Sequence, residues 1–177
     1  MSRTVYLSYI NYRNWGVFLN SLVDTNNAIS KEYSQLSNQL DALLTGESNF
    51  YSNLSNASAL LNQFFDRINW VGFYLMEEGE LVLGPFQGLP ACVRIAVGKG
   101  VCGTAVETRE SIIVPDVHAF PGHIACDAAS QSEIVIPIIK DDVVLGVLDI
   151  DSAELNRFSE DDRLGLELVV SKLIKHI

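Results

Sequence analysis

Residues 69–85, NWVGFYLMEEGELVLGP, decide the fold, because here the hydrophobic period changes from helical spacing to two residues. Residues 69–75 alternate between two sets of apolar side chains, which predicts a strand. The tripeptide EEG at 77–79 predicts a turn, and residues 80–85 predict the second strand of a hairpin. Two strands joined by so short a turn must be antiparallel.

Helical periodicity precedes this hairpin and returns at the end of the chain. A leucine-rich stripe predicts a first helix that stops before Gly46, and residues 53–68 predict a second one. Ser159 is the expected N-cap of the last helix, because three acids follow it in the first turn. The remaining segments are expected as strands at 111–114, 134–139 and 143–150, a short helix at 104–107, and a long loop at 115–132. This order predicts an α+β fold with a central antiparallel sheet flanked by helices.

The composition indicates one acidic domain and excludes several classes of partner. The chain has 177 residues, 48% of them hydrophobic, which suits a single domain with a full core. Twelve basic and 22 acidic residues leave a net charge of −10, so neither nucleic acid nor a membrane surface is an expected partner. No apolar run approaches the roughly 20 residues of a membrane-spanning helix. The oligomeric state is left open between a monomer and a homodimer.

Residues 1–30 differ from the rest and are expected to be an N-terminal extension of a domain at 31–177. The first 23 residues hold two arginines and no acid, which also fits a weak organelle presequence. Trp15 and Phe18 are able to pack against the domain, which favours a plain extension. No compact apolar segment follows a basic start, so no secretory signal is expected and a cytoplasmic location is predicted.

Three cysteines stand in the part of the chain that glycine and proline interrupt. Cys92, Cys102 and Cys126 lie 10 and 24 residues apart, outside the strongly periodic elements. In a reducing compartment they indicate free thiols, redox chemistry or a metal site rather than structural disulfides. The alternative is that small buried hydrophobes happen to be cysteine. A metal site would need His123 as well as all three cysteines, and no C-x-x-C motif is present, so no metal is expected.

Carboxylates form a second group of candidate residues. Alternation places Asp149 and Asp151 side by side at the end of a strand, on the same face as Leu145 and Val147. Glu133 opens the neighbouring strand. A single acid at a strand end is ordinarily solvated. Three acids near a thiol-bearing loop are able instead to bind an ammonium group or to transfer a proton.

Aromatic side chains form the third group. Trp70 and Tyr74 lie on one face of the strand 69–75, on either side of Gly72. They indicate a pocket wall in which the glycine leaves room between the rings, and two further core aromatics are the alternative from the pattern alone. His118 lies in the same long loop as Cys126, where it either lowers the pKa of that thiol or is simply solvated.

Five phrases of the sequence resemble the free methionine-R-sulfoxide reductase family. They run from about residue 33 to the end of the chain and read LSNQLDALLTGE, LSNASALLNQFFDRINWVGFYL, LVLGPFQGLPACVRIAVGKGVCGTAVE, IIVPDVHAFPGHIACDAASQSEIVIPI and GVLDIDS. The specific part is the cysteine spacing, with NWVGFYL before it and LDIDS after it. The resemblance implies a GAF fold, which agrees with the α+β prediction, and makes 31–177 a GAF-type catalytic domain.

The resemblance also implies an activity and a set of site residues. The implied reaction is thiol-dependent reduction of free methionine-R-sulfoxide, without a cofactor and with thioredoxin as the external reductant. A thiolate attacks the sulfoxide sulfur, an acid protonates the oxygen, and a second cysteine converts the resulting sulfenic acid to a disulfide. The positions that match the family are the cysteines Cys92, Cys102 and Cys126, the acids Glu133, Asp149 and Asp151, and the pocket aromatics Trp70 and Tyr74.

Cys126 is the expected nucleophile, because it lies in the long loop between His123 and Glu133, which are able to transfer protons. Cys92 is the expected resolving partner, since two loops reach the Cα separation of a disulfide, about 7 Å or less, more easily than two strands. Cys102 is a second resolver or an alternate nucleophile, whose place beside a helix start allows a lowered pKa. A GAF sensor that binds a small molecule without catalysis is the leading alternative, and a zinc-bound structural module is the third.

Overall fold

Six strands and four α-helices make up the part of the chain that a computed structural model describes, residues 29–124 and 126–177. The elements are α2 (Lys31–Leu44), α3 (Phe50–Phe64), β1 (Trp70–Glu77), β2 (Glu80–Gly88), β3 (Arg94–Ala96), α4 (Gly100–Thr108), β4 (Ile112–Val114), η1 (Val117–Ala119), β5 (Ser132–Lys140), β6 (Val143–Ser152), α5 (Glu160–Leu173) and η2 (Ile174–His176). The strands form one antiparallel sheet in the order β3-β2-β1-β6-β5-β4. The predicted α+β class is therefore confirmed.

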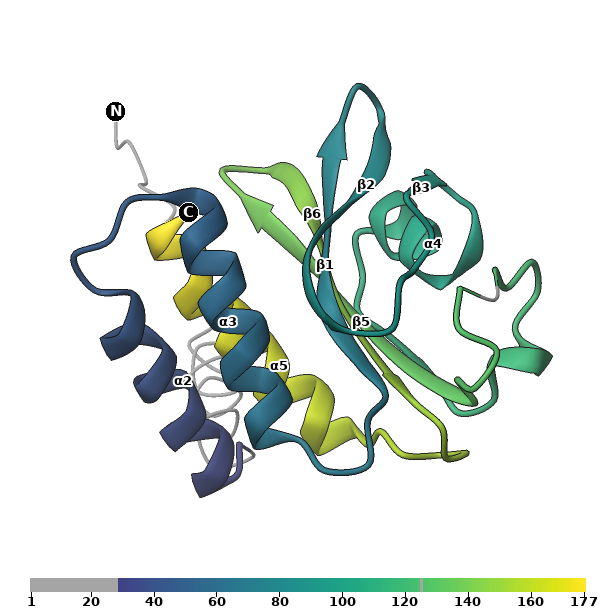
Figure 1. Cartoon of the computed structure of the whole chain (residues 1–177), viewed down its shortest axis with the longest axis horizontal. Helices are drawn as coiled ribbons and strands as arrows, with labels where there is room; N and C mark the ends of the chain where they lie inside the picture. Colours follow the sequence, from purple (N-terminus) through teal and green to yellow (C-terminus); the bar gives the residue numbers. More distant parts are fainter. Residues whose placement is uncertain (1–28, 125) are drawn as a thin grey trace, which may run out of the picture.

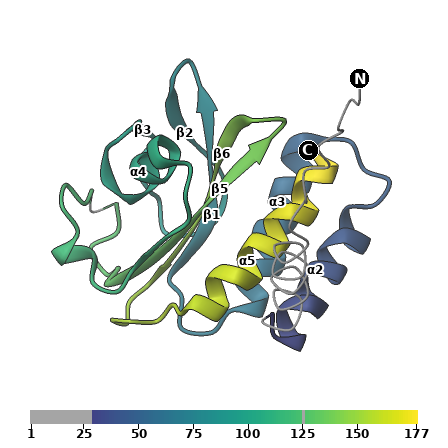
Figure 2. The same cartoon turned by 180° about the vertical axis from the view of Figure 1, so that it is seen from behind.

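The sheet separates two hydrophobic cores of different size. Helices α2, α3 and α5 lie on one face, and α4 with the segments around it lies on the other (Figures 1 and 2). Val71, Phe73 and Leu75 of β1 pack with the three long helices. Trp70 and Tyr74, which alternate with them, pack with α4. The two-residue period read from the sequence thus assigns each side chain of β1 to the correct face.

The hairpin β1–β2 forms as predicted. Its turn lies at Glu78 and Gly79, whose φ angles of 51° and 89° suit a two-residue connection between twisted strands. The second strand runs to Gly88, beyond the predicted end at Pro85. A register shift in the middle of the hairpin marks a β-bulge. The bulge accommodates the proline within the strand, because proline has no N–H to give to the ladder.

A second irregularity corrects the alternation predicted along β6. Asp149 and Asp151 share a face with Val147 as expected, but Leu145 packs with the core on the opposite face. The register of β5 and β6 shifts here, next to Gly146, which takes a φ of 157°. A Cβ on this glycine would lie 2.2 Å from a carbonyl oxygen of β1. Only glycine therefore lets the two strands approach so closely at this point.

The long helices bury the leucine stripes that the sequence predicts, with errors at their ends. The predicted stripe of α2 consists of Leu36, Leu40, Leu43 and Leu44. Three of these leucines are buried, and Leu43 is 48% exposed. α3 both begins and ends earlier than the predicted 53–68. Its last turn stops at Phe64, because Phe65 takes an extended conformation, and Arg67 with a φ of 55° lies in the turn that leads to β1.

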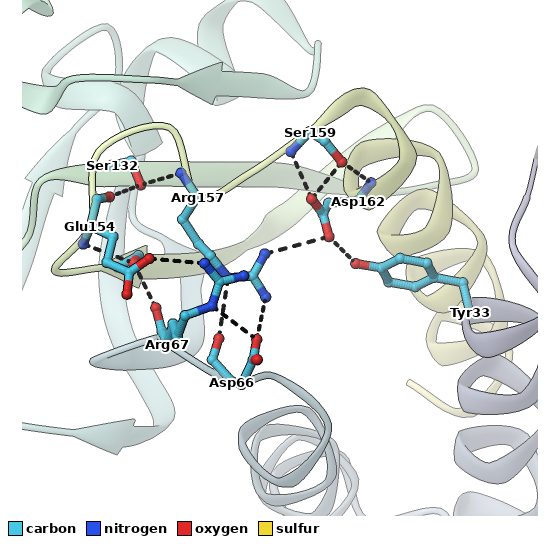
Figure 3. Close-up of polar contacts among 9 residues, drawn as sticks. Tyr33, Asp66, Arg67, Ser132, Glu154, Arg157, Ser159 and Asp162 are labelled. Atoms are coloured by element: carbon cyan, nitrogen blue, oxygen red, sulfur yellow. Dashed lines mark hydrogen bonds and ion pairs between the residues drawn. The ribbon is translucent and has the colours of Figure 1, made fainter.

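A polar network ties α2 and α5 to the loops beside the sheet (Figure 3). Ser159 caps α5 as predicted. Its hydroxyl accepts from the Asp162 N–H, and the Asp162 carboxylate accepts from the Ser159 N–H, which completes a capping box. The Tyr33 hydroxyl donates to Asp162 Oδ1 at 2.5 Å. Arg157, which precedes α5, donates to the backbone carbonyl and carboxylate of Asp66. The start of α5 is therefore bonded to α2 through Tyr33 and to the loop after α3 through Asp66.

Within residues 29–124 and 126–177, no helix is both long enough and apolar enough to cross a membrane. The predicted N-terminal extension at 1–30, and its presequence alternative, fall almost wholly on residues 1–28, outside the described residues. The predicted domain 31–177 starts at the first residue of α2.

Candidate active site

Three carboxylates meet at one end of β5 and β6, on the face that α4 covers. Glu133 lies directly opposite Asp151 across these strands. Asp149 lies two residues before Asp151 and opposite Gly72 of β1. All three carboxylates line one cavity together with Cys102. Glu133 and Asp149 are only 6% exposed, so these two are not solvated strand ends.

Cys102 lies on α4 rather than in a loop, which corrects its placement from the sequence. The helix is longer than the predicted 104–107. It starts at one glycine and contains another, and because glycine is a poor helix former, the sequence pattern did not indicate its first turn. Gly103 lets α4 lie against β3, because a Cβ there would be 2.3 Å from the carbonyl oxygen of Ala96. The buried Cys102 thiol donates to Glu133 Oε1 at an S–O distance of 3.8 Å.

Cys102 and the carboxyl groups of Glu133, Asp149 and Asp151 form one cluster, and burial raises the pKa of all four groups. It raises the pKa of Asp149 to about 7. For Glu133 and Asp151, burial raises the pKa well above the ordinary value, and the charge of Asp149 raises it further. The pKa of Cys102 is also raised, by burial first and then by the neighbouring carboxylates, so the lowered pKa expected for this thiol is wrong. At neutral pH the cluster retains protons that solvated carboxyl groups would lose.

The cluster lacks a positive partner among the described residues. Oδ1 of Asp149 is buried and has no hydrogen-bond partner there. The described residues that line the cavity include four acids and His123 but no lysine or arginine. A buried acceptor without a partner is costly. The site therefore favours a ligand that brings a positive charge or hydrogen-bond donors.

Cys92 and Cys126 are joined by a disulfide, with their Cα atoms 5.3 Å apart. They come from the β2–β3 connection and the loop before β5, the two loops that the sequence analysis paired. Cys126 lines the same cavity as the carboxylates, so the disulfide borders the acid cluster. The zinc module considered from the sequence needed all three thiols, and this state does not offer them because two are bonded to each other.

Trp70 and Tyr74 hold the loop that carries Cys92. The Trp70 indole N–H donates to a backbone carbonyl of this loop at 3.1 Å, and the Tyr74 hydroxyl donates to the Cys92 carbonyl at 3.0 Å. The space beside Gly72 is not open, contrary to expectation, because Phe86 stacks on Trp70 with ring centroids 5.3 Å apart and fills it. Tyr74 lines the cavity directly.

The cavity between these groups is small. Its free volume is about 30 Å³, enough for one water-sized group. His123 also lines it, and the ring of His118 lies against His123 with centroids 6.3 Å apart. The loop that carries Cys126 therefore forms one wall of the site.

Sequence reasoning missed the residues that hold this loop in place. The Asn69 side-chain amide donates to Asp127 Oδ2 at 2.8 Å and to Ser130 Oγ at 3.0 Å. Asp127 also accepts from the Ala129 N–H, so its place beside Cys126 in a turn-forming sequence was an available signal. No local pattern distinguished Asn69 or Ser130.

The sheet, the covering helices and the enclosed pocket define a GAF domain, and the GAF domain family matches residues 54–173. The free methionine-R-sulfoxide reductase of Escherichia coli strain K12 is 53% identical over 143 residues, 81% of this chain and 87% of that protein. The reductase of the same name from Saccharomyces cerevisiae is 49% identical over 148 residues, 79% of this chain and 82% of that protein. The structure of fRMsr of Staphylococcus aureus in complex with substrate has a TM-score of 0.78 and 56% identity, over 81% of this chain and 94% of that one. The chain therefore belongs to the free methionine-R-sulfoxide reductase family, a family of oxidoreductases.

Proposed function

We propose that this protein reduces free methionine-R-sulfoxide to methionine with its own cysteines. The observation that carries the proposal is the Cys92–Cys126 disulfide beside the buried acids in the lining of one cavity. Reduction of a sulfoxide needs a redox-active thiol and a proton for the oxygen, and the cavity offers both. The substrate follows from the family to which the chain belongs.

We assign the nucleophilic attack to Cys126 and the resolving step to Cys92. The Cys126 thiolate attacks the sulfoxide sulfur, and the oxygen takes up one proton and passes to the cysteine, which leaves methionine and a sulfenic acid. The Cys92 thiol then displaces water to form the disulfide. Cys102 is less suited to attack, because burial and the neighbouring carboxylates raise its pKa and keep it as a thiol.

The acids supply the proton and select the free amino acid. Because burial raises the pKa of Asp149 to about 7, the cluster holds a transferable proton at neutral pH. The α-ammonium of free methionine sulfoxide complements the buried carboxylates, whereas a peptide-bound residue lacks that charge. The 30 Å³ cavity does not admit a whole amino acid, so substrate binding requires the loop with Cys126 to open when the disulfide is reduced.

An external dithiol protein, thioredoxin in this proposal, resets the enzyme by thiol–disulfide exchange. Leu89 and Val93 flank Cys92 and are each 63% exposed, which offers apolar surface beside the disulfide. Such recycling requires a reducing compartment, which supports a location in the cytoplasm. The residues of the proposed site all belong to one chain. A homodimer remains a prediction, which a measurement of the molecular mass in solution would test.

The test of the proposed function is a methionine-release assay with three substrates: the free R-sulfoxide, the free S-sulfoxide and the N-acetylated R-sulfoxide. We expect turnover of the first and little of the other two. Comparable turnover of the acetylated substrate would contradict selection by the α-ammonium. A sensor would bind the sulfoxide without releasing methionine.

The roles of the cysteines are tested by single turnover without a recycling reductant. Cys126→Ser should release no methionine. Cys92→Ser should release one equivalent and stall as a sulfenic acid, which a dimedone-type reagent traps. A full burst from Cys126→Ser together with none from Cys102→Ser would reverse the assignment.

A further inference from the structure

We propose that Cys102, Glu133 and Asp149 form a binding site for one Zn²⁺ ion, and that this ion inhibits the protein. The three side chains each offer one donor atom, and these atoms all lie within 4.8 Å of one another. The ion is an inhibitor in this proposal and takes no part in the reaction. Its inhibitory effect rests on the proposed function, whereas its binding does not.

The separation of the donors fits tetrahedral zinc. Zinc binds sulfur at about 2.3 Å and carboxylate oxygen at about 2.0–2.2 Å, which places a sulfur and an oxygen of one tetrahedral site about 3.6 Å apart. Cys102 Sγ lies 3.8 Å from Glu133 Oε1. The two side chains therefore already stand at the spacing of a zinc pair, and the donor atom of Asp149 lies within 4.8 Å of both.

The environment of the donors favours a cation. Oδ1 of Asp149 is buried without a partner among the described residues. Asp151 and Asp127 also line the cavity, whose described lining holds no lysine or arginine. A divalent ion would coordinate the free oxygen and would also offset the charge that the carboxyl groups acquire when they lose their protons to bind it, whereas water would satisfy the oxygen alone.

The size of the cavity and the donor types together select the ion. A free volume of about 30 Å³ accommodates an ion with one water as its fourth ligand. One cysteine sulfur, whose proton the metal displaces into solvent on binding, together with two carboxylates suits zinc, whereas magnesium and calcium require more oxygen ligands. An ion in this place would occupy the position proposed for the ammonium group of the substrate.

The binding test uses the full-length oxidised protein, in which the disulfide leaves Cys102 as the free thiol. Calorimetric titration with ZnCl₂ should show one ion per chain, and Co²⁺ should produce a near-ultraviolet thiolate-to-cobalt band. Cys102→Ser should abolish the band and weaken zinc binding about 100-fold or more, because even outer-shell partners are worth about 10–100-fold. Glu133→Gln and Asp149→Asn should each weaken binding at least about 10-fold.

The matched control is the double variant His118→Ala/His123→Ala, because these two neighbouring rings are the other zinc-ligand side chains beside the cavity. We expect it to bind zinc as the wild type does. Loss of binding in the double variant with retention in Cys102→Ser would place the ion on the histidines and overturn the proposal. Failure of the oxidised wild-type protein to bind one equivalent would also overturn it.

The inhibition test uses reduced, desalted wild-type protein in single turnover, so that no external thiol competes for the metal. Preincubation with one equivalent of ZnCl₂ should suppress the release of methionine, and excess chelator should restore it. Zinc binding through Cys102 in a protein that never releases methionine would mean that the proposed function fails while the metal site stands. Full methionine release from the zinc-loaded protein would overturn the inhibitory role.

Discussion

Replacement of Asp149 by Asn should make the protein more stable above neutral pH. The side chain is 6% exposed, and burial raises its pKa from 3.8 to about 7. Between these values the unfolded chain has lost a proton that the folded chain still holds, so stability falls as pH rises through this window and stays low above it. At about 1.4 kcal/mol per pH unit, the loss above pH 7 is about 4 kcal/mol. Asparagine cannot ionise and removes this loss.

Urea denaturation of the oxidised protein at pH 5 and pH 8 measures the effect. The stability of Asp149→Asn relative to wild type should be about 3 kcal/mol higher at pH 8 than at pH 5, the part of the loss that falls within this interval. Asp161→Asn, at an exposed position of α5, is the control and should change stability by about 1 kcal/mol or less at both values. A difference between Asp149→Asn and wild type that is equal at pH 5 and pH 8 would refute the reasoning.

Three further predictions concern packing, capping and the free thiol. Gly165→Ala should destabilise the fold by about 1–3 kcal/mol in urea denaturation, because its Cβ would lie 2.1 Å from the Tyr33 ring; an unchanged midpoint would contradict close packing of α2 on α5. Ser159→Ala should lower the free energy of unfolding by about 1 kcal/mol through loss of the capping box, measured against Ser171→Ala as an exposed control. Cys102 in the oxidised native protein should react with a thiol reagent far more slowly than after unfolding, because it is buried and its pKa is raised; equal rates would show that α4 opens readily.

Local periodicity placed most of the elements, because alternation and helical stripes record which face of an element is buried. The hairpin at 69–85 and the N-cap at Ser159 form where the sequence predicts them. The errors occur where contacts distant in sequence decide the backbone. The start of α4 was missed because glycine has a low helix propensity, yet Gly103 is required there for the contact with β3.

The cysteines show the same contrast between what a local pattern predicts and what contacts distant in sequence decide. Cys92 and Cys126 were expected to pair because both lie in loops, and the structure joins them. The direction of the pKa shift of Cys102 was predicted wrongly. A helix start near a thiol suggests a lowered pKa, but burial between α4 and the sheet, and then the carboxylates of β5 and β6, raise that pKa instead.

By itself, the sequence determined the α+β class, the family and the inventory of reactive groups: three thiols, three acids and two aromatics. Only the tertiary structure decided which of these groups meet and how they titrate. It sets Cys102 against Glu133, 31 residues away, and leaves an oxygen of Asp149 buried without a partner among the described residues. Burial and charge–charge interactions depend on separations of a few ångströms across the fold. A local sequence period records only which face of an element is buried, so it can name a carboxylate but cannot set its pKa.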